Sequence, residues 1–277
     1  SFLYYCGLDS PNLNLLINTY ENTATLYGTS QSIDDVIWCG QSNTLNELAG
    51  LAHIDQISKK NNIKEDVNRI LSKGEKFHIL PQYRSDNKQI LSEIFGEDKW
   101  QNYISMDLIR SVIAQRSIKS ELEVGEIIDA MVVTKSMHEM AMMNTKPGKT
   151  EQEIVVELVS LVHSKGIRLA YPSIFTVRGE ILHNQSYGST LQDGQLLLHD
   201  GGAESKEHYA TDITRTYPVT GRFSSKQKSI YEIVLKMQED VIQSLSPEVK
   251  YLDMHQLASR ICIEGLKSMG IMKGNIE

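Results

Sequence analysis

Residues 196–218 read LLLHDGGAESKEHYATDITRTYP, and this stretch decides how the second half of the chain folds. Asp200 and Asp212 lie twelve positions apart in it, each on a segment with the pattern of a β-strand. A polar loop that begins with two glycines separates the segments. If the segments fold back as a hairpin, both carboxylates lie near each other on a rigid frame. Carboxylate oxygens suit hard divalent cations, so the pattern indicates a metal site.

Each aspartate also has a plain structural interpretation, as a solvated residue beside a turn or as a partner of Arg215. A buried aspartate without a partner would cost several kcal/mol, which a divalent cation offsets. The paired glycines and the Thr-Arg-Thr-Tyr-Pro run form a longer and less common pattern than two isolated acids, and they favour the metal site. His199 falls on the opposite face of its strand from Asp200, and we expect it to be structural.

The composition bounds the class of protein. Its 277 residues suffice for one large domain or two ordinary ones, and 40% hydrophobic with 23% charged residues is typical of a soluble globular protein. The net charge of −7, without a basic cluster, argues against nucleic acid as a partner. No apolar run reaches the length of about eighteen residues that a membrane span needs.

The three widely spaced cysteines form no zinc pattern, and we expect buried, inert thiols in a reducing cytoplasm: Cys6, Cys39 and Cys262.

The first part of the chain alternates strand-like and helical patterns, which predicts a small α/β domain. The aromatic run from residue 2 has the pattern of a strand. Further strands are expected at 13–18, 23–27, 36–39 and 77–80, and helices at 43–57, 63–72 and 89–95.

The later part predicts an antiparallel sheet flanked by helices, which is an α+β arrangement. Ser120 with Glu123, and Thr150 with Glu153, have the spacing of capping boxes at two helix starts. Strands are expected at 173–177, 180–183, 195–200 and 209–217, and helices at 106–115, 120–144, 150–166, 225–245 and 252–269. The methionines of the second helix are expected in the core: Met137, Met140, Met142 and Met143. We place the boundary near residues 110–120, which gives domains 1–112 and 113–277.

The string HDGGAESKEHYATDITRTYPVTGRF closely resembles the metal-binding hairpin of the pita-bread metallopeptidases, specifically aminopeptidase P and prolidase. The segments KPGKTEQEI, AYPSIFTVRGEILHNQ and FSSKQKSIYEIVLKMQ occur in the order expected for that family. FLYYCGLDSPNLNLLI and DDVIWCGQ are similar to the N-terminal domain of the aminopeptidase P branch. The resemblance, closest to the Xaa-Pro aminopeptidases, implies a creatinase/prolidase-like α/β N-terminal domain followed by an incomplete α+β pita-bread domain.

The resemblance implies a role for four residues. Asp200 matches a terminal ligand of one metal, and Asp212 matches the aspartate that bridges two metals. His183 matches the substrate-binding histidine that stabilises the developing oxyanion; its plain interpretation is a strand histidine bonded to backbone. Trp38 matches a tryptophan that reaches the active site of a neighbouring subunit and contacts substrate, and its plain interpretation is a core or surface aromatic.

The chain departs from the family in one respect. The family uses five metal ligands, and only the two aspartates are matched here, since His255 and Glu264 fall on a helix and do not fit. A histidine and two glutamates would follow in segments beyond this sequence. We therefore expect a chain truncated at both ends that is inactive alone, with a weak, open metal site.

The resemblance implies a cytoplasmic Xaa-Pro aminopeptidase, a hydrolase that removes the first residue of peptides with proline second. It implies two divalent ions, with Mn²⁺ preferred over Co²⁺, Zn²⁺ or Mg²⁺, a proline-containing peptide as partner, neither nucleic acid nor membrane, and a homodimer or homotetramer. Two alternatives stay open: a prolidase acting on Xaa-Pro dipeptides, and a non-catalytic pita-bread relative that binds a peptide or protein.

Overall fold

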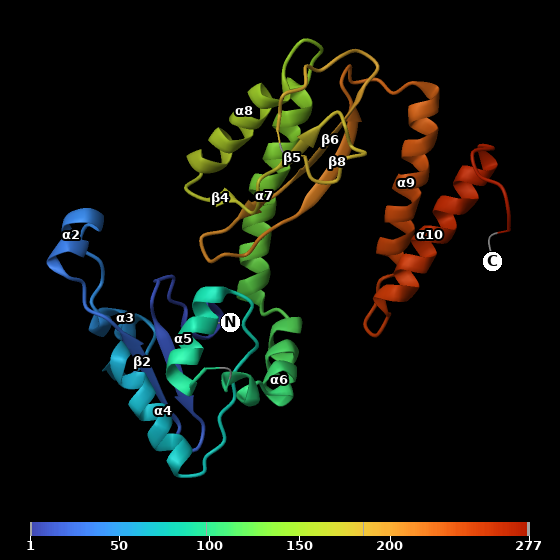
Figure 1. Cartoon of the computed structure of the whole chain (residues 1–277). Helices are drawn as coiled ribbons and strands as arrows, with labels where there is room; N and C mark the ends of the chain where they lie inside the picture. Colours follow the sequence, from blue (N-terminus) through green and yellow to red (C-terminus); the bar gives the residue numbers. More distant parts are fainter. Residues whose placement is uncertain (1, 98, 185, 276–277) are drawn as a thin grey trace. The chain divides into compact units, whose positions relative to one another are not determined.

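The computed structural model describes residues 2–97, 99–184 and 186–275 and divides into two compact units, residues 1–118 and 119–277 (Figure 1). The predicted boundary between the two domains, at residues 112 and 113, falls inside α6 (Met106–Ser117). This boundary stays a prediction. Within the described residues, no helix is both long and apolar enough to cross a membrane.

The first unit is built on a three-stranded mixed sheet in the order β1 (Asn14–Asn18), β2 (Thr23–Gly28) and β3 (Gln56–Lys59). β1 pairs antiparallel with β2, and β2 pairs parallel with β3. Leu26 and Ala49 are buried between the sheet and its helices. The helices of this unit besides α6 are α1 (Phe2–Cys6), α2 (Ile33–Cys39), α3 (Leu45–Leu51), α4 (Ile63–Ser72) and α5 (Ser85–Phe95), with short 3₁₀ turns at Lys60–Asn62 and Trp100–Tyr103.

Four sequence predictions in the first unit differ from the structure. The aromatic run from residue 2 is helix α1, not a strand. Residues 36–39 belong to helix α2, because Ser32 and Asp35 form a capping box that starts a helix ahead of them. At 77–80 only an isolated bridge forms, between Ile79 and Ile104. The helix expected at 43–57 is shorter, and its last residues form β3 instead.

The second unit begins with two capped helices, α7 (Glu121–Asn144) and α8 (Glu151–Ser164), and both predicted capping boxes are confirmed. A three-stranded antiparallel sheet follows in the order β5 (Ile174–Thr176), β6 (Leu196–Gly201) and β8 (Ile213–Pro218). A smaller sheet pairs β4 (Arg168–Leu169) with β7 (Ala203–Glu204). α7 packs along β6, β7 and β8 (Figure 1).

The core of the second unit lies between these helices and the sheets, around residues that are almost fully buried: Met137, Ala141, Ile154, Leu158, Phe175, Leu191 and Leu197. The prediction that all four methionines of α7 lie in the core is wrong for Met142 and Met143. Both side chains are exposed, because they lie on the face of α7 turned away from this core. The thiol prediction is also wrong in part, since Cys39 is exposed and Cys262 half-buried.

The strand expected at 180–183 is a turn. Ile181 donates its backbone N–H to the carbonyl of Arg178, and the Arg178 guanidinium pairs with Glu180 at 2.9 Å. Leu182 is 80% exposed, so the alternating pattern there has no buried face to fill.

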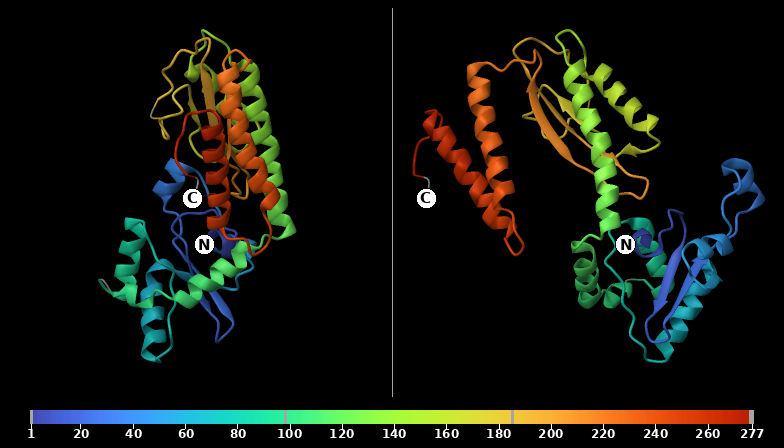
Figure 2. Two further views of the ribbon diagram at one scale, coloured as in Figure 1. Left: turned by 90° about the vertical axis from the view of Figure 1, so that its right-hand side faces the viewer. Right: turned by 180° about the vertical axis from the view of Figure 1, so that it is seen from behind.

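The last two helices, α9 (Ser225–Ser244) and α10 (Tyr251–Ser268), lie side by side as a helical hairpin (Figure 2). Gly265 allows their close approach, because a Cβ atom there would lie 2.6 Å from Ile233. Gln227 of α9 donates to the carbonyl of Gly194 in the turn before β6.

Candidate metal centre

The aspartates lie at the end of the β6–β8 hairpin where the connecting loop joins the two strands. Asp200 is on β6 opposite Thr214, and Asp212 immediately precedes β8. The hairpin predicted from the sequence is therefore present, with β7 inserted in its connecting loop.

A close backbone approach holds this end of the hairpin together. A Cβ atom at Gly202 would lie 1.7 Å from the carbonyl oxygen of Thr211, so only glycine fits. The Ala203 N–H donates to the hydroxyls of Thr134 (2.9 Å) and Thr211 (3.1 Å), and these two buried hydroxyls lie 2.6 Å apart. The hairpin is thus fastened to α7 behind it.

Tyr171 brings the two carboxylates together. Its hydroxyl oxygen lies 2.5 Å from Oδ1 of Asp200 and 2.8 Å from Oδ1 of Asp212, and its single proton is shared between these two acceptors. The two carboxylate oxygens are therefore separated by at most the sum of these distances, about 5.3 Å. Burial, followed by the hydrogen bonds to the two aspartates, raises the pKa of Tyr171 well above its ordinary value, so the hydroxyl keeps its proton.

The alternative pairing of an aspartate with Arg215 does not occur. The Arg215 guanidinium donates to the carbonyl of Thr214, and across the described ranges neither Asp200 nor Asp212 forms an ion pair. Two carboxylates thus share one neutral donor, and their negative charge is not balanced by a basic side chain.

The aspartates open onto a cavity of about 720 Å³ that His183 also lines. The remaining lining residues are Tyr171, Pro172, Ser173, Ile174, Asn184 and Tyr187. His183 is exposed, on the turn that replaces the expected strand. The structure therefore brings together three of the four predicted site residues.

The loop that carries His183 is fastened at both ends by one buried carboxylate. Glu151, at the start of α8 and 1% exposed, accepts the Val177 N–H at 2.9 Å and the Ser189 N–H at 3.2 Å. A carboxylate at a helix N-terminus is also favoured by the helix dipole.

Behind the sheet, His199 is fully buried and its ring lies 4.1 Å from that of His138. Burial, with a smaller contribution from His138, lowers the pKa of His199 to about 3. Burial likewise lowers the pKa of His138. Both rings are therefore neutral near pH 7, and His199 lies buried on the strand face opposite Asp200, as expected.

Trp38, the fourth predicted residue, lies on α2 in the first unit and is 85% exposed. Its predicted contact with a substrate in a neighbouring subunit stays a prediction.

The residues present fit part of a metal site. Two carboxylates offer oxygen ligands suited to a hard divalent cation, and no basic side chain among the described residues pairs with either of them. The described residues contain no cluster of three or more histidine, cysteine, aspartate or glutamate side chains that could hold a metal. The hairpin alone thus offers two candidate ligands, Asp200 and Asp212.

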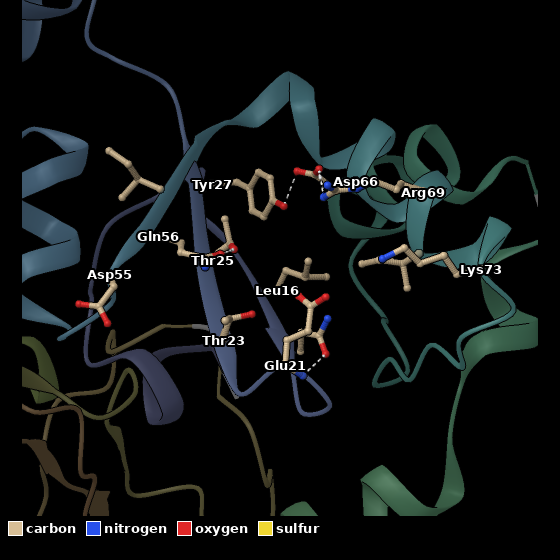
Figure 3. Close-up of a pocket in the computed structure, with 13 residues that line it drawn as sticks. Leu16, Glu21, Thr23, Thr25, Tyr27, Asp55, Gln56, Asp66, Arg69 and Lys73 are labelled. Carbon is tan, nitrogen blue, oxygen red and sulfur yellow. Dashed lines mark hydrogen bonds and ion pairs between the residues drawn. The ribbon is translucent and has the colours of Figure 1, made fainter.

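A second polar cavity, of about 490 Å³, lies in the first unit between the sheet and α4 (Figure 3). Its carboxylate Asp66 accepts a hydrogen bond from Tyr27 at 2.7 Å and pairs with Arg69 at 2.6 Å. Glu21 and Asp55 also line this cavity, but Asp66 already has a basic partner, so the cavity is the weaker candidate for a cation.

Residues 125–274 match metallopeptidase family M24, and residues 1–80 match the aminopeptidase P N-terminal domain. The first match spans more than half of the chain, which belongs to metallopeptidase family M24. The predicted family and fold class, an α/β N-terminal domain followed by α+β pita-bread structure, are thereby confirmed.

The curated relatives and the solved structures that this chain resembles agree with this family assignment. A "Probable Xaa-Pro aminopeptidase" of Verticillium alfalfae is 31% identical over 283 residues, covering 100% of this chain and 59% of that protein. The Zn-substituted E. coli aminopeptidase P in complex with product has a TM-score of 0.86 at 27% identity, covering 99% of this chain and 65% of that chain. The proline aminopeptidase P II from Yersinia pestis has a TM-score of 0.84 at 26% identity, covering 99% and 66%. The chain thus spans about 59% of the length of the curated relative.

Two site residues were missed from the sequence. Tyr171 contacts acids 29 and 41 positions away, and Glu151 contacts loops 26 and 38 positions away. Both contacts depend on how the strands pair, which no local pattern indicates.

Proposed function

We propose that the protein is a metal-dependent aminopeptidase that removes the N-terminal residue from peptides with proline in second position. The observation that supports this most is the pair of aspartates held by one tyrosine hydroxyl in a cavity shared with His183. The names of the relatives point to the same activity.

In this proposal Asp200 and Asp212 hold the cation, with Asp212 shared between two ions. Mn²⁺ is the preferred ion, and Co²⁺, Zn²⁺ or Mg²⁺ would also suit oxygen ligands. A divalent ion bound there would lower the pKa of a water molecule so that hydroxide forms near neutral pH. His183 would donate a hydrogen bond to the substrate carbonyl oxygen as negative charge develops on it.

The exposed Trp38 fits a cytoplasmic homodimer or homotetramer in which the first unit of one subunit contacts substrate in another. Substrate length separates the aminopeptidase from the prolidase alternative, since a prolidase would cleave Xaa-Pro dipeptides and leave tripeptides intact.

The test is Asp212→Asn, which keeps the shape of the side chain and removes its charge. We expect the chain to lose most of its Mn²⁺ binding, measured by electron paramagnetic resonance of free Mn²⁺ during titration. Asp193→Asn, in an exposed turn of the same unit, is the matched control and should bind like the wild type. In the complete enzyme, Asp212→Asn should also abolish cleavage of Xaa-Pro peptides, and unchanged cleavage would refute the assigned role.

A further inference from the structure

We propose that Tyr171 is a positioning residue that holds Asp200 and Asp212 at the separation a shared cation requires. The inference rests on the proposed function, because it assigns a role within the same metal centre. Tyr171 is not itself offered as a ligand or as a catalytic group.

The hydroxyl of Tyr171 contacts one oxygen of each aspartate, and in both cases the atom is Oδ1. The other oxygen, Oδ2, accepts no hydrogen bond from a described residue. One oxygen of each carboxylate is thus oriented by the protein, and the other stays available to a cation. Carboxylates that bind metals are commonly oriented in this way by an outer hydrogen bond.

The backbone that carries Tyr171 is fixed on both sides. Just before it, β4 pairs with β7, and the Ala170 N–H donates to the Gly202 carbonyl at 2.9 Å. Just after it, β5 pairs with β6, placing Ile174 opposite Asp200. Pro172 follows Tyr171 directly and restricts its backbone to extended conformations.

A further hydrogen bond steadies the same segment, since the Tyr187 hydroxyl donates to the Ser173 carbonyl at 2.5 Å. The Tyr171 hydroxyl is therefore presented from a rigid support to two acids on the neighbouring hairpin. Such pre-organisation limits the rearrangement that a binding cation would otherwise have to impose on the acids.

The charge balance supports positioning over neutralisation. A tyrosine hydroxyl donates one proton and adds no positive charge, so it can hold two acids together without cancelling the charge that attracts a cation. A lysine or arginine in the same place would compete with the metal.

The experiment measures Mn²⁺ affinity of the 277-residue chain by electron paramagnetic resonance, with Tyr171→Phe compared with wild type. We expect the dissociation constant to rise about 10–100-fold, the usual effect of losing an outer-shell partner. Tyr217→Phe is the matched control, because it removes a partly buried hydroxyl from β8 that contacts Thr145 and no aspartate, and it should bind within about threefold of wild type.

A further measurement tests the positioning role directly. In a metal-free crystal structure of Tyr171→Phe, the two Oδ1 atoms should lie farther apart than the present limit of about 5.3 Å.

The outcomes separate this inference from the proposed function. If Asp212→Asn weakens Mn²⁺ binding while Tyr171→Phe leaves it unchanged or tightens it, the metal centre stands and the role of Tyr171 is overturned. If the wild type binds no Mn²⁺, or Asp212→Asn has no effect, both are overturned.

Discussion

Each of the two units contains a tyrosine hydroxyl bonded to an aspartate in a polar cavity, and the difference between the two contacts is instructive. In the first unit, Tyr27 and Arg69 both bind Asp66 (Figure 3). In the second, Tyr171 alone serves Asp200 and Asp212. In the first cavity Asp66 has a basic partner, whereas in the second neither Asp200 nor Asp212 pairs with a basic side chain of the described residues.

The comparison shows that a tyrosine–aspartate contact carries no functional meaning by itself. Stability favours a carboxylate that has a basic partner, as in the first unit. Two acids that are held together without a basic partner lower the stability of a folded chain. Such an arrangement is expected where an external cation completes it.

The largest expected effect comes from separating the two acids. Gly202→Ala would place a Cβ atom 1.7 Å from the Thr211 carbonyl, so the hairpin must open. We expect a loss of about 3 kcal/mol or more from the second unit and loss of Mn²⁺ binding. Gly188→Ala, where a Cβ atom meets nothing within 4 Å, is the control and should change neither.

The two units can be followed separately in this experiment. Both tryptophans, Trp38 and the buried Trp100, lie in the first unit, so their fluorescence reports on that unit. The fluorescence transition of Gly202→Ala should stay near that of the wild type while the circular dichroism transition moves to lower temperature. A hairpin that tolerates alanine with wild-type stability and metal binding would show that the close approach is unimportant.

The second prediction concerns how the stability of the second unit depends on pH. The folded pKa of His199 is about 3, below its ordinary value of about 6.5, so the unfolded chain binds this proton more readily. The contribution of His199 to the free energy of unfolding is therefore fully present above about pH 6.5. Between about pH 6.5 and about pH 3, the free energy of unfolding falls by about 1.4 kcal/mol per pH unit.

Because His199 and His138 are both in the second unit, acid should unfold that unit before the first. Urea unfolding at pH 7 and pH 5, followed by circular dichroism and by tryptophan fluorescence, measures the difference. His199→Leu should flatten the pH dependence of the circular dichroism midpoint. An unchanged slope in that variant would assign the acid response to other groups.

The smallest effects are expected in the first unit. Tyr27→Phe should cost about 1–2 kcal/mol, since it removes a hydrogen bond to a charged, half-buried acid. Arg69→Ala should cost within about 0.5 kcal/mol, because the arginine is 67% exposed. Neither should alter Mn²⁺ binding. If Arg69→Ala created a new Mn²⁺ site, an unpaired charge alone would suffice, and the paired geometry of the second unit would lose its significance.

Local rules predicted much of this fold. The capping boxes at Ser120 and Thr150 start helices where expected, and the β6–β8 hairpin follows from the strand patterns around Asp200 and Asp212. The strand expected at 36–39 is part of α2 instead, where the capping box of Ser32 and Asp35 starts a helix despite the β-branched residues that follow.

The rest depended on tertiary structure. The alternation at 180–183 suits a strand, yet no neighbouring strand pairs with it, and the turn between Arg178 and Ile181 forms instead. The hydroxyl of Tyr171 meets its acids only because β4 and β5 pair with different parts of one hairpin. Sequence reasoning therefore found the two acids and His183 but not the tyrosine that joins the acids.

The two hydrogen bonds that Glu151 accepts, from Val177 and Ser189, close the intervening segment into a ring. Changes in the number of residues inside such a ring need not disturb the β-sheet, because both attachment points stay where they are. The reach of His183 over the cavity can therefore be lengthened or shortened by insertions and deletions while the acids remain in place. Under the proposed function, the segment whose length can change and the hairpin that holds the acids are therefore separate parts of one site.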